Sequence, residues 1–349
     1  MTAGTNKQRR VAQLRPMTLD EIVQLPPPQW LVEGHLQADG LTVLFGAPGA
    51  GKTFIALDWA LSVATGTAWL GCQTQPCEVV YIYAEGIRGI SQRCKAWFKE
   101  HEIEAASKFR AIPCSVNMLD GTDRGFLATA IKDAKLTPGL IVIDTLARNF
   151  GGGDENQTKD MNLFINGCDD LRQEHFPGVT VMVIHHTGKN AKRGARGAIA
   201  LTGAADAEFF IEKLRGSKDK LKLVNTKQKD SEALPDQRLQ LVPVGESCVI
   251  RAPDAAEAAK AEAAEAAERG TAKTDNEVFF ALLPFGPEGA SYSQWREASN
   301  KAKATFDRSR DRLVTAGRVK HDGERYHCVV APDDPAPDAP NENKGEAAP

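Results

Sequence analysis

The chain has 349 residues, of which 42% are hydrophobic and 26% are charged, a length typical of about two domains with one large core. Its net charge of −3 excludes a uniformly basic nucleic-acid-binding coat, although it is compatible with a local basic patch. No apolar run approaches the roughly 18 to 20 residues that a membrane span needs, and no apolar stretch follows the basic N-terminus as in a signal peptide.

The seven cysteines form no C-x-x-C pair, and an odd number in a chain of this size indicates reduced thiols in the cytoplasm. His321, His327 and Cys328 are metal-binding residue types, but their number and spacing do not suit a zinc site. The sequence therefore favours a cytoplasmic protein with no disulfides and no contact with membranes.

The first two thirds of the chain predict an α/β domain. Residues 1–20 are polar and basic and are expected to be flexible. From residue 21 to 251, short β-branched runs alternate with helical patterns, which is typical of βαβ units around a mostly parallel sheet. The expected strands are Leu41–Gly46, Glu78–Ala84, Leu140–Asp144, Val179–Ile184, Ala207–Glu212 and Leu221–Thr226.

The last hundred residues divide into three parts. Residues 252–271 are almost purely helix formers and predict a helical linker that stops at Gly270. Residues 272–331 predict a compact module of three helices followed by a hairpin around Asp322-Gly323. Residues 332–349 contain no aromatic or β-branched residue and are expected to be a disordered acidic tail.

A glycine-rich motif follows the first expected strand and precedes a helical pattern, as a P-loop requires. Its glycines let backbone N–H groups close around phosphate oxygens, and the helix N-terminus adds its positive dipole end. The lysine is expected to reach the β- and γ-phosphates of ATP, and the threonine hydroxyl to bind Mg²⁺. The motif is Gly46-Ala47-Pro48-Gly49-Ala50-Gly51-Lys52-Thr53.

Two acidic residues close later strands. Asp144 ends a strand of four apolar residues, where a buried carboxylate needs a cation nearby, so we interpret it as the Walker B ligand of Mg²⁺. Glu85 follows the strand after the P-loop helix, and chemistry in parallel sheets gathers at the carboxyl ends of strands. We expect Glu85 to face the γ-phosphate from the strand next to the P-loop strand, although a surface glutamate would look the same.

Two histidines, His185 and His186, end the fourth expected strand. Adjacent residues of a strand point to opposite faces, so at most one of them can face the nucleotide. A neutral imidazole there could bind the γ-phosphate and report its loss, whereas a purely structural histidine is the alternative.

The order of these motifs resembles the RecA-like ATPase core. More narrowly, Y-I-Y-A-E-G, I-V-I-D-T-L-A-R-N-F and V-I-H-H-T-G-K, followed by Arg196-Gly197, are similar to the RepA-like hexameric replicative helicases of plasmids and phages, over residues from about 29 to 230. The resemblance implies that Glu85 is the catalytic base and His186 the phosphate sensor. It also implies a homo-oligomeric, hexameric ring that pulls single-stranded DNA through a central channel.

The chain departs from that family at the arginine finger, because Asp206 stands at the expected position. Lys227 and Lys229 lie two residues apart on an alternating strand, and RecA-like recombinases carry a similar lysine pair that enters the neighbouring subunit's ATP site. A cation there stabilises the charge on the transferring phosphoryl group. A solvated strand end is the alternative, and Arg215 and Lys213 are the other candidates.

In this fold the loops after the Walker B and histidine strands are expected to face DNA. The second loop has glycines and no acidic residue, which suits binding to the phosphate backbone. In the first loop Phe150 could stack on a base, although packing is the commoner role of such an aromatic. The cations of the two loops are Arg148 and then Lys189, Lys192, Arg193 and Arg196.

The C-terminal module resembles a winged helix. Residues 301–320 hold seven basic and two acidic side chains, which suits a recognition helix in the major groove of duplex DNA, although winged helices also bind proteins. The cations of this helix are Lys303, Arg308, Arg310 and Arg312.

Together these features predict an ATP- and Mg²⁺-dependent DNA motor of the replicative helicase kind. Two other functions remain open. One is a recombination ATPase whose filament remodels DNA without separating strands, and the other is a DNA-binding regulator that ATP only switches. Strand separation coupled to hydrolysis distinguishes the helicase from both.

Overall fold

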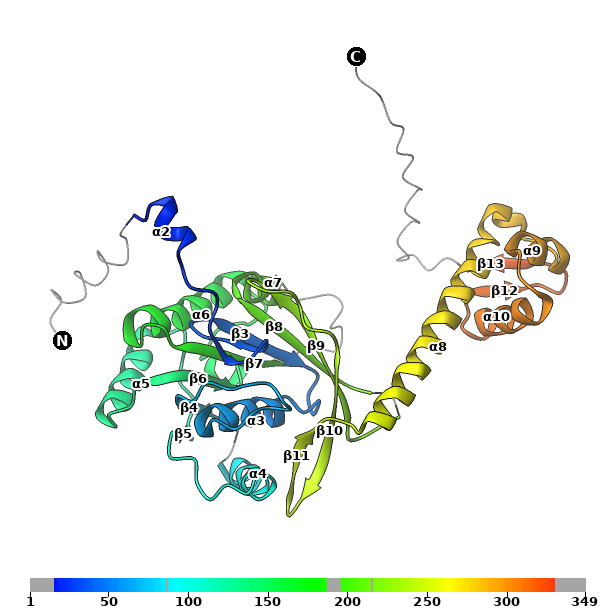
Figure 1. Ribbon diagram of the computed structural model, residues 1–349. Helices are drawn as coiled ribbons and strands as arrows, with labels where there is room; N and C mark the ends of the chain where they lie inside the picture. The colour runs from blue at the N-terminus through cyan, green and yellow to red at the C-terminus, as the bar shows by residue number, and fades with distance from the viewer. Residues whose placement is uncertain (1–15, 86, 187–195, 215, 330–349) are drawn as a thin grey trace. The chain divides into compact units, whose positions relative to one another are not determined.

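The computed structural model describes residues 16–85, 87–186, 196–214 and 216–329 (Figure 1). The chain divides into two compact units, the first ending at Pro253 and the second beginning at Asp254. Within the described part of the chain, no helix has the length and apolar character needed to cross a membrane.

The first unit is built on a nine-stranded sheet in the order β11-β10-β9-β8-β3-β7-β6-β4-β5 (Figure 1). The strands from β8 to β5 are parallel, and β9, β10 and β11 extend the sheet as an antiparallel edge. The predicted α/β class with a mostly parallel sheet is therefore confirmed. The strands are β3 (Leu41–Gly46), β4 (Glu78–Tyr83), β5 (Phe109–Ile112), β6 (Pro138–Asp144), β7 (Thr180–His186), β8 (Ala207–Lys213), β9 (Lys220–Gln228), β10 (Gln237–Val244) and β11 (Ser247–Arg251).

Helices cover both faces of this sheet. Successive side chains of each strand point to opposite faces, and they therefore pack in two separate hydrophobic cores. Leu44, Tyr81 and Val142 pack on the side of α3 (Lys52–Thr65) and α4 (Ile87–Glu100). Their neighbours, such as Val43 and Ile141, pack on the opposite side. That side is covered by α5 (Gly121–Asp133), α6 (Thr158–Asp170), its π-helical extension η2 (Leu171–His175) and α7 (Arg196–Ala204).

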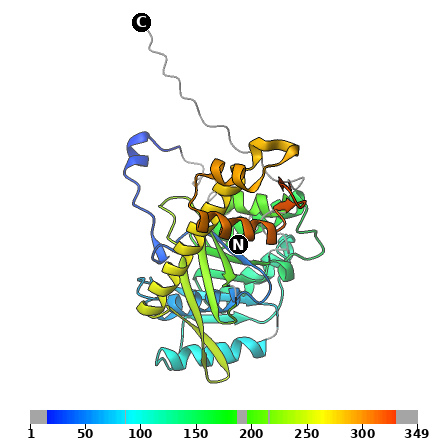
Figure 2. The same cartoon turned by 90° about the vertical axis from the view of Figure 1, so that its right-hand side faces the viewer.

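All six predicted strands are present, with ends that differ by at most two residues. The sequence did not predict β5, β10 and β11, which lie toward the edges of the sheet, where half-exposed side chains weaken the apolar pattern. α4 packs against the β10–β11 pair, which crosses in front of this cyan helix in Figure 2. Arg251 and Glu100 join them through a two-point ion pair with N–O distances of 2.6 and 2.7 Å.

Short elements precede the sheet. A helix, α2 (Leu19–Val23), begins within the segment that was expected to be flexible, and Thr18 caps it through a capping box with Glu21. A small antiparallel pair, β1 (Trp30–Val32) and β2 (Leu36–Gln37), then leads into β3.

The second unit contains three helices and a hairpin, as its sequence predicts. Its core includes Val278, Trp295, Phe306 and Leu313. The elements are α8 (Ala255–Phe280), a 3-10 turn η3 (Leu283–Glu288), α9 (Tyr292–Ser299), α10 (Lys303–Thr315), β12 (Val319–His321) and β13 (Tyr326–Cys328).

The predicted stop of the linker at Gly270 is wrong, because α8 continues through it to Phe280. A glycine inside a helix costs about 1 kcal/mol relative to alanine. Burial of Val278 and Phe279 at the end of the same helix offsets that cost, since a fully buried apolar side chain contributes about 1.5–3 kcal/mol. The linker and the first helix of the C-terminal module are therefore one continuous helix.

Asp58 of α3 is a buried carboxylate between two tryptophans. Its side chain accepts hydrogen bonds from the indole N–H groups of Trp69 (2.8 Å) and Trp97 (2.5 Å). Burial raises the pKa of the Asp58 carboxyl from 3.8 to about 7, against the two indole donors, which lower it. The P-loop helix therefore carries a group that titrates near neutral pH.

We expect Asp58→Asn to change how stability depends on pH. The folded-state pKa lies above the unfolded value, so the folded protein binds the extra proton between about pH 4 and pH 7 and loses this stabilisation as the pH rises. Asparagine cannot ionise, so between pH 4.5 and 7.5 the wild type should lose on the order of 3 kcal/mol relative to the variant. Urea unfolding followed by circular dichroism measures this, and parallel stability curves for the two proteins would contradict it.

Candidate nucleotide-binding site

The P-loop joins the carboxyl end of β3 to the N-terminus of α3. Two of its glycines are required by the local geometry: a Cβ on Gly46 would lie 2.3 Å from the carbonyl oxygen of Ile211, and Gly51 has a φ of +100°. The first N–H groups of a helix have no partner inside it, so the start of α3 offers donors to an anion. The strand, the glycine-dependent turn and the helix N-terminus are therefore arranged as the P-loop motif predicts.

Lys52 is the first residue of α3, and its side chain folds back over the loop. The ammonium group donates hydrogen bonds to the carbonyl oxygens of Gly46 (2.8 Å) and Ala47 (2.9 Å), and lies 2.8 Å from Nδ1 of His186. Burial lowers the pKa of Lys52 to about 8, against the attraction of Asp144 and Glu85. A buried ammonium group held by neutral partners is well placed to exchange them for phosphate oxygens.

Asp144 ends β6 and is fully buried. Its Oδ1 lies 3.5 Å from the hydroxyl of Thr53, and its Oδ2 accepts a hydrogen bond of 2.8 Å from the hydroxyl of Tyr81. Burial raises the pKa of the Asp144 carboxyl to about 6, and the hydrogen bonds from Tyr81 and Thr53 oppose this rise.

A threonine hydroxyl beside a carboxylate oxygen suits Mg²⁺, which prefers hard oxygen ligands and keeps several waters. The buried carboxylate also has no cationic side chain hydrogen-bonded to it among the described residues, so a bound cation would offset the cost of its charge. Thr53 and Asp144 are therefore the residues that could hold the metal ion.

Glu85 follows β4 and is exposed. Its Oε1 lies 3.4 Å from the hydroxyl of Thr145, the residue after Asp144. The expectation that β4 lies next to the P-loop strand is wrong, because β7 and β6 lie between β3 and β4. The connection through α3 passes over two strand positions, and later segments of the chain fill them.

The two histidines point to different surroundings, as their alternation predicts. His186 pairs with Gly46 across β7 and β3 and contacts Lys52. His185 lies 4.0 Å from a carboxylate oxygen of Glu155, and burial lowers the pKa of His185 to about 4. His186 is therefore the histidine on the P-loop side, and its contact with the lysine links β7 to the phosphate loop.

The loop after β6 contains the short helix η1 (Ala147–Asn149), in which Arg148 is exposed. Phe150 is 2% exposed and stacks on Phe164 with ring centroids 5.6 Å apart. Its role in the structure is therefore packing, and base stacking by Phe150 is not supported. In the second loop, Lys189, Lys192 and Arg193 lie outside the described residues, and Arg196 is the first residue of α7.

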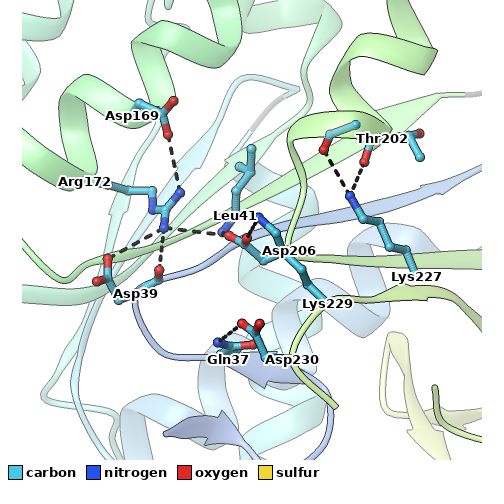
Figure 3. A network of polar contacts seen from close by, with 11 residues as sticks. Gln37, Asp39, Leu41, Asp169, Arg172, Thr202, Asp206, Lys227, Lys229 and Asp230 are labelled. Carbon is cyan, nitrogen blue, oxygen red and sulfur yellow. Dashed lines mark hydrogen bonds and ion pairs between the residues drawn. The ribbon is translucent and has the colours of Figure 1, made fainter. Parts of the chain in front are cut away.

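Figure 3 shows where Lys227 and Lys229 lie. The Lys227 ammonium group donates to the carbonyl oxygens of Thr202 (2.7 Å) and Gly203 (3.1 Å), and the Lys229 ammonium group binds Asp206 at 3.1 Å. Both cations thus bind groups of their own chain. This arrangement does not test a role in a neighbouring subunit, which stays a prediction.

Asp206, at the expected finger position, has a structural role. Its Oδ2 accepts a hydrogen bond of 2.8 Å from the backbone N–H of Leu41, and Arg172 lies 3.7 Å away (Figure 3). Leu41 begins β3, whereas the P-loop follows the carboxyl end of β3. Asp206 and the two lysines therefore lie at the end of the central strands that is opposite to the P-loop. Lys213 lies at the other end of β8, which is the end of the strands where the P-loop lies, and it is exposed. Arg215 lies outside the described residues.

Carboxylates pair with part of the basic charge of α10, and one of them, Asp275, lies outside the counted residues 301–320. Arg312 forms a two-point ion pair with Asp275 of α8 at 2.8 and 2.6 Å, and Arg310 binds Asp311 and Asp307. Lys303 and Arg308 of α10 are exposed, and neither forms an ion pair with a carboxylate of the described residues. The count of seven basic and two acidic residues therefore overestimates the positive charge of this surface.

Two residues that touch the site were not predicted, Tyr81 and Thr145. Tyr81 carried a signal, because a tyrosine within a buried aliphatic strand must find a partner for its hydroxyl. The sequence could not say which partner, since that depends on which strand lies next to β4.

The fold and the site together define a P-loop ATPase with a RecA-like α/β core. A family model described as an AAA domain matches residues 8–192, more than half of the chain, and the chain belongs to this family. No curated protein matches it.

Two solved structures resemble the chain in fold. One is a KaiC-like protein of the hyperthermophilic archaeon Pyrococcus horikoshii OT3, with 14% identity over 64% of this chain and 96% of that chain and a TM-score of 0.45. The other is a RadB recombinase, with 17% identity over 59% of this chain and 88% of that chain and a TM-score of 0.41.

Proposed function

We propose that this protein is an ATP- and Mg²⁺-dependent motor that acts on DNA, as a replicative helicase of the plasmid and phage kind. One observation carries the proposal: His186 touches the P-loop lysine, and the basic loop of residues 187–196 follows it directly in the chain. A change at the phosphates would move His186 and therefore the start of that loop. This connection couples the state of the nucleotide to contacts with a phosphate backbone.

The residues of the site divide the chemistry among them. Lys52 and the backbone of Gly46–Thr53 bind the phosphates, and Thr53 and Asp144 hold the metal ion. Bound Mg²⁺ would neutralise the charge that develops on the transferring phosphoryl group. Glu85 orients and deprotonates the attacking water, with Thr145 holding its carboxylate, and His186 senses the γ-phosphate.

The DNA contacts come from charge rather than from base recognition. Arg148, Lys189, Lys192, Arg193 and Arg196 contact single-stranded DNA in a central channel. The C-terminal unit acts as a winged helix that binds duplex DNA, chiefly through Lys303 and Arg308, since Arg310 and Arg312 are paired with carboxylates of their own chain. Such a site would be weaker and more salt-sensitive than the composition of α10 suggests.

RecA- and KaiC-like ATPases often oligomerise, and we propose a hexameric ring in which a cation of one subunit completes the next subunit's ATP site. Lys227 and Lys229 are the proposed cations, and entry into a neighbour requires them to leave Thr202, Gly203 and Asp206. Arg215 and the exposed Lys213 are the alternatives.

Removing the charge of the basic loop should weaken binding to single-stranded DNA. We expect the triple variant Lys192→Ala, Arg193→Ala, Arg196→Ala to bind single-stranded DNA about 10- to 100-fold more weakly near 0.1 M salt. The negative slope of log K against log salt should also become shallower by about 2, because fewer counterions are released. Fluorescence anisotropy of a labelled oligothymidine over a salt series measures both quantities.

A matched control variant removes three exposed cations that lie outside the basic loop, with the same change in net charge. They are Lys95, Lys99 and Lys135. It should leave the salt slope near that of the wild type. Equal slopes in the two triple variants would remove the basic loop from the DNA path.

Strand separation tests the function as a whole. A forked DNA duplex should be unwound only when ATP is hydrolysed, and single-stranded DNA should stimulate that hydrolysis. Stimulation without unwinding would favour a recombination ATPase, and sequence-specific duplex binding with negligible turnover would favour a regulator.

A further inference from the structure

Tyr81 lies in the middle of β4, one strand away from Asp144, and its side chain is fully buried. β4 and β6 are parallel neighbours in which Tyr83 pairs with Asp144, so Tyr81 lies two residues earlier on the same face. From there the long phenol reaches along the sheet, and its hydroxyl donates a 2.8 Å hydrogen bond to Oδ2 of Asp144.

This hydrogen bond distinguishes the two oxygens of the Asp144 carboxylate. Oδ2 is engaged by Tyr81, whereas Oδ1 is the oxygen beside the hydroxyl of Thr53, at 3.5 Å. The tyrosine hydroxyl thereby resists rotation of the carboxylate about its Cβ–Cγ bond.

We propose that Tyr81 is a positioning residue for the divalent cation that accompanies the nucleotide: it keeps Oδ1 of Asp144 directed toward Thr53. The proposal rests on the proposed binding of Mg²⁺ with ATP. Groups that hold a metal-binding carboxylate through its other oxygen typically change metal affinity by about 10- to 100-fold.

The alternative is that Tyr81 is only a core residue whose hydroxyl uses Asp144 as a convenient acceptor. A core role would affect stability, but it would not affect the dependence of nucleotide binding on Mg²⁺. Neighbouring Tyr83 provides the comparison, because its hydroxyl lies 3.3 Å from a guanidinium nitrogen of Arg93 and its side chain is also buried.

The test measures binding of a fluorescent N-methylanthraniloyl ADP to the full chain over a Mg²⁺ titration and in EDTA. Tyr81→Phe should require about 10-fold more Mg²⁺ to reach half of the metal-dependent gain in affinity, and its affinity in EDTA should be within twofold of the wild type. Tyr83→Phe should keep the Mg²⁺ requirement of the wild type.

A double-variant cycle places the effect on Asp144. Asp144→Asn should lose most of the Mg²⁺-dependent gain, and adding Tyr81→Phe to it should change nothing further. Thermal melts establish that each variant is folded at the assay temperature, and an additive cycle would overturn the proposal.

The outcomes separate this proposal from the proposed function. If the wild type gains affinity with Mg²⁺ and folded Tyr81→Phe follows the same titration, the positioning role is overturned while the nucleotide site stands. An equal shift in Tyr83→Phe would also overturn it, because loss of any buried hydroxyl would then suffice. If the wild type itself gains no affinity from Mg²⁺, the proposed metal site at Thr53 and Asp144 fails and the role of Tyr81 fails with it.

Discussion

Glu85→Gln is expected to bind ATP with the affinity of the wild type and to hydrolyse it about 100- to 10,000-fold more slowly. The amide has the size of the carboxylate, so it can replace the contact with Thr145, which lies 3.4 Å from Oε1 of Glu85. It cannot accept a proton from the attacking water. This one variant should therefore keep the ATP affinity of the wild type while its rate of hydrolysis falls.

Single-turnover hydrolysis and equilibrium nucleotide binding measure the two effects on the same preparation. Glu104→Gln, in an exposed segment, removes the same charge and should hydrolyse ATP at the wild-type rate. Near-normal turnover in Glu85→Gln would mean that another residue activates the water.

Lys52→Ala is expected to lower nucleotide affinity by at least about 100-fold, which corresponds to roughly 3 kcal/mol of binding free energy. The variant removes the ammonium group that would bind the β- and γ-phosphates. It also removes the contacts of that group with Gly46, Ala47 and His186. Equilibrium titration with a fluorescent nucleotide measures the loss, and Lys95→Ala, at an exposed position of α4, should bind the nucleotide normally.

The same lysine predicts the pH dependence of binding by the wild type. Burial lowers the pKa of Lys52 to about 8, so the ammonium group loses its proton as the pH rises above that value. Nucleotide affinity should then fall by up to about tenfold for each further pH unit, because binding must recover the proton. Lys52→Arg should show no such fall, since a guanidinium keeps its charge. Nucleotide affinity that does not change between pH 8 and pH 10 would contradict the lowered pKa of Lys52.

The parts of the site that the sequence predicted best are local ones. The P-loop needs a strand, a glycine-rich turn and a helix in direct succession, and all three are contiguous from Leu41 to Thr65. Alternation along β7 likewise predicts that His185 and His186 separate, because side-chain direction in a strand has a period of two. Such features follow from backbone geometry over a few residues.

Features that depend on pairing between distant segments were predicted less well. Glu85 was expected on the strand beside β3, but β6 and β7 occupy the positions between. The excess positive charge expected on α10 is partly cancelled by Asp275, which pairs with Arg312 and lies 37 residues before it in the chain. Counting charges along a segment omits partners that come from another helix.

The sequence by itself determined the α/β class, the P-loop and the acidic ends of β4 and β6, because each depends on apolar periodicity and on residue order within one strand–loop–helix unit. Only the tertiary structure decided that His186 lies against Lys52, that Tyr81 holds Asp144, and that Asp206 binds the N–H of Leu41. Those contacts depend on which strands become neighbours in the nine-stranded sheet. Strand order is set by the packing of helices on both faces of the whole sheet, a choice that no single segment encodes.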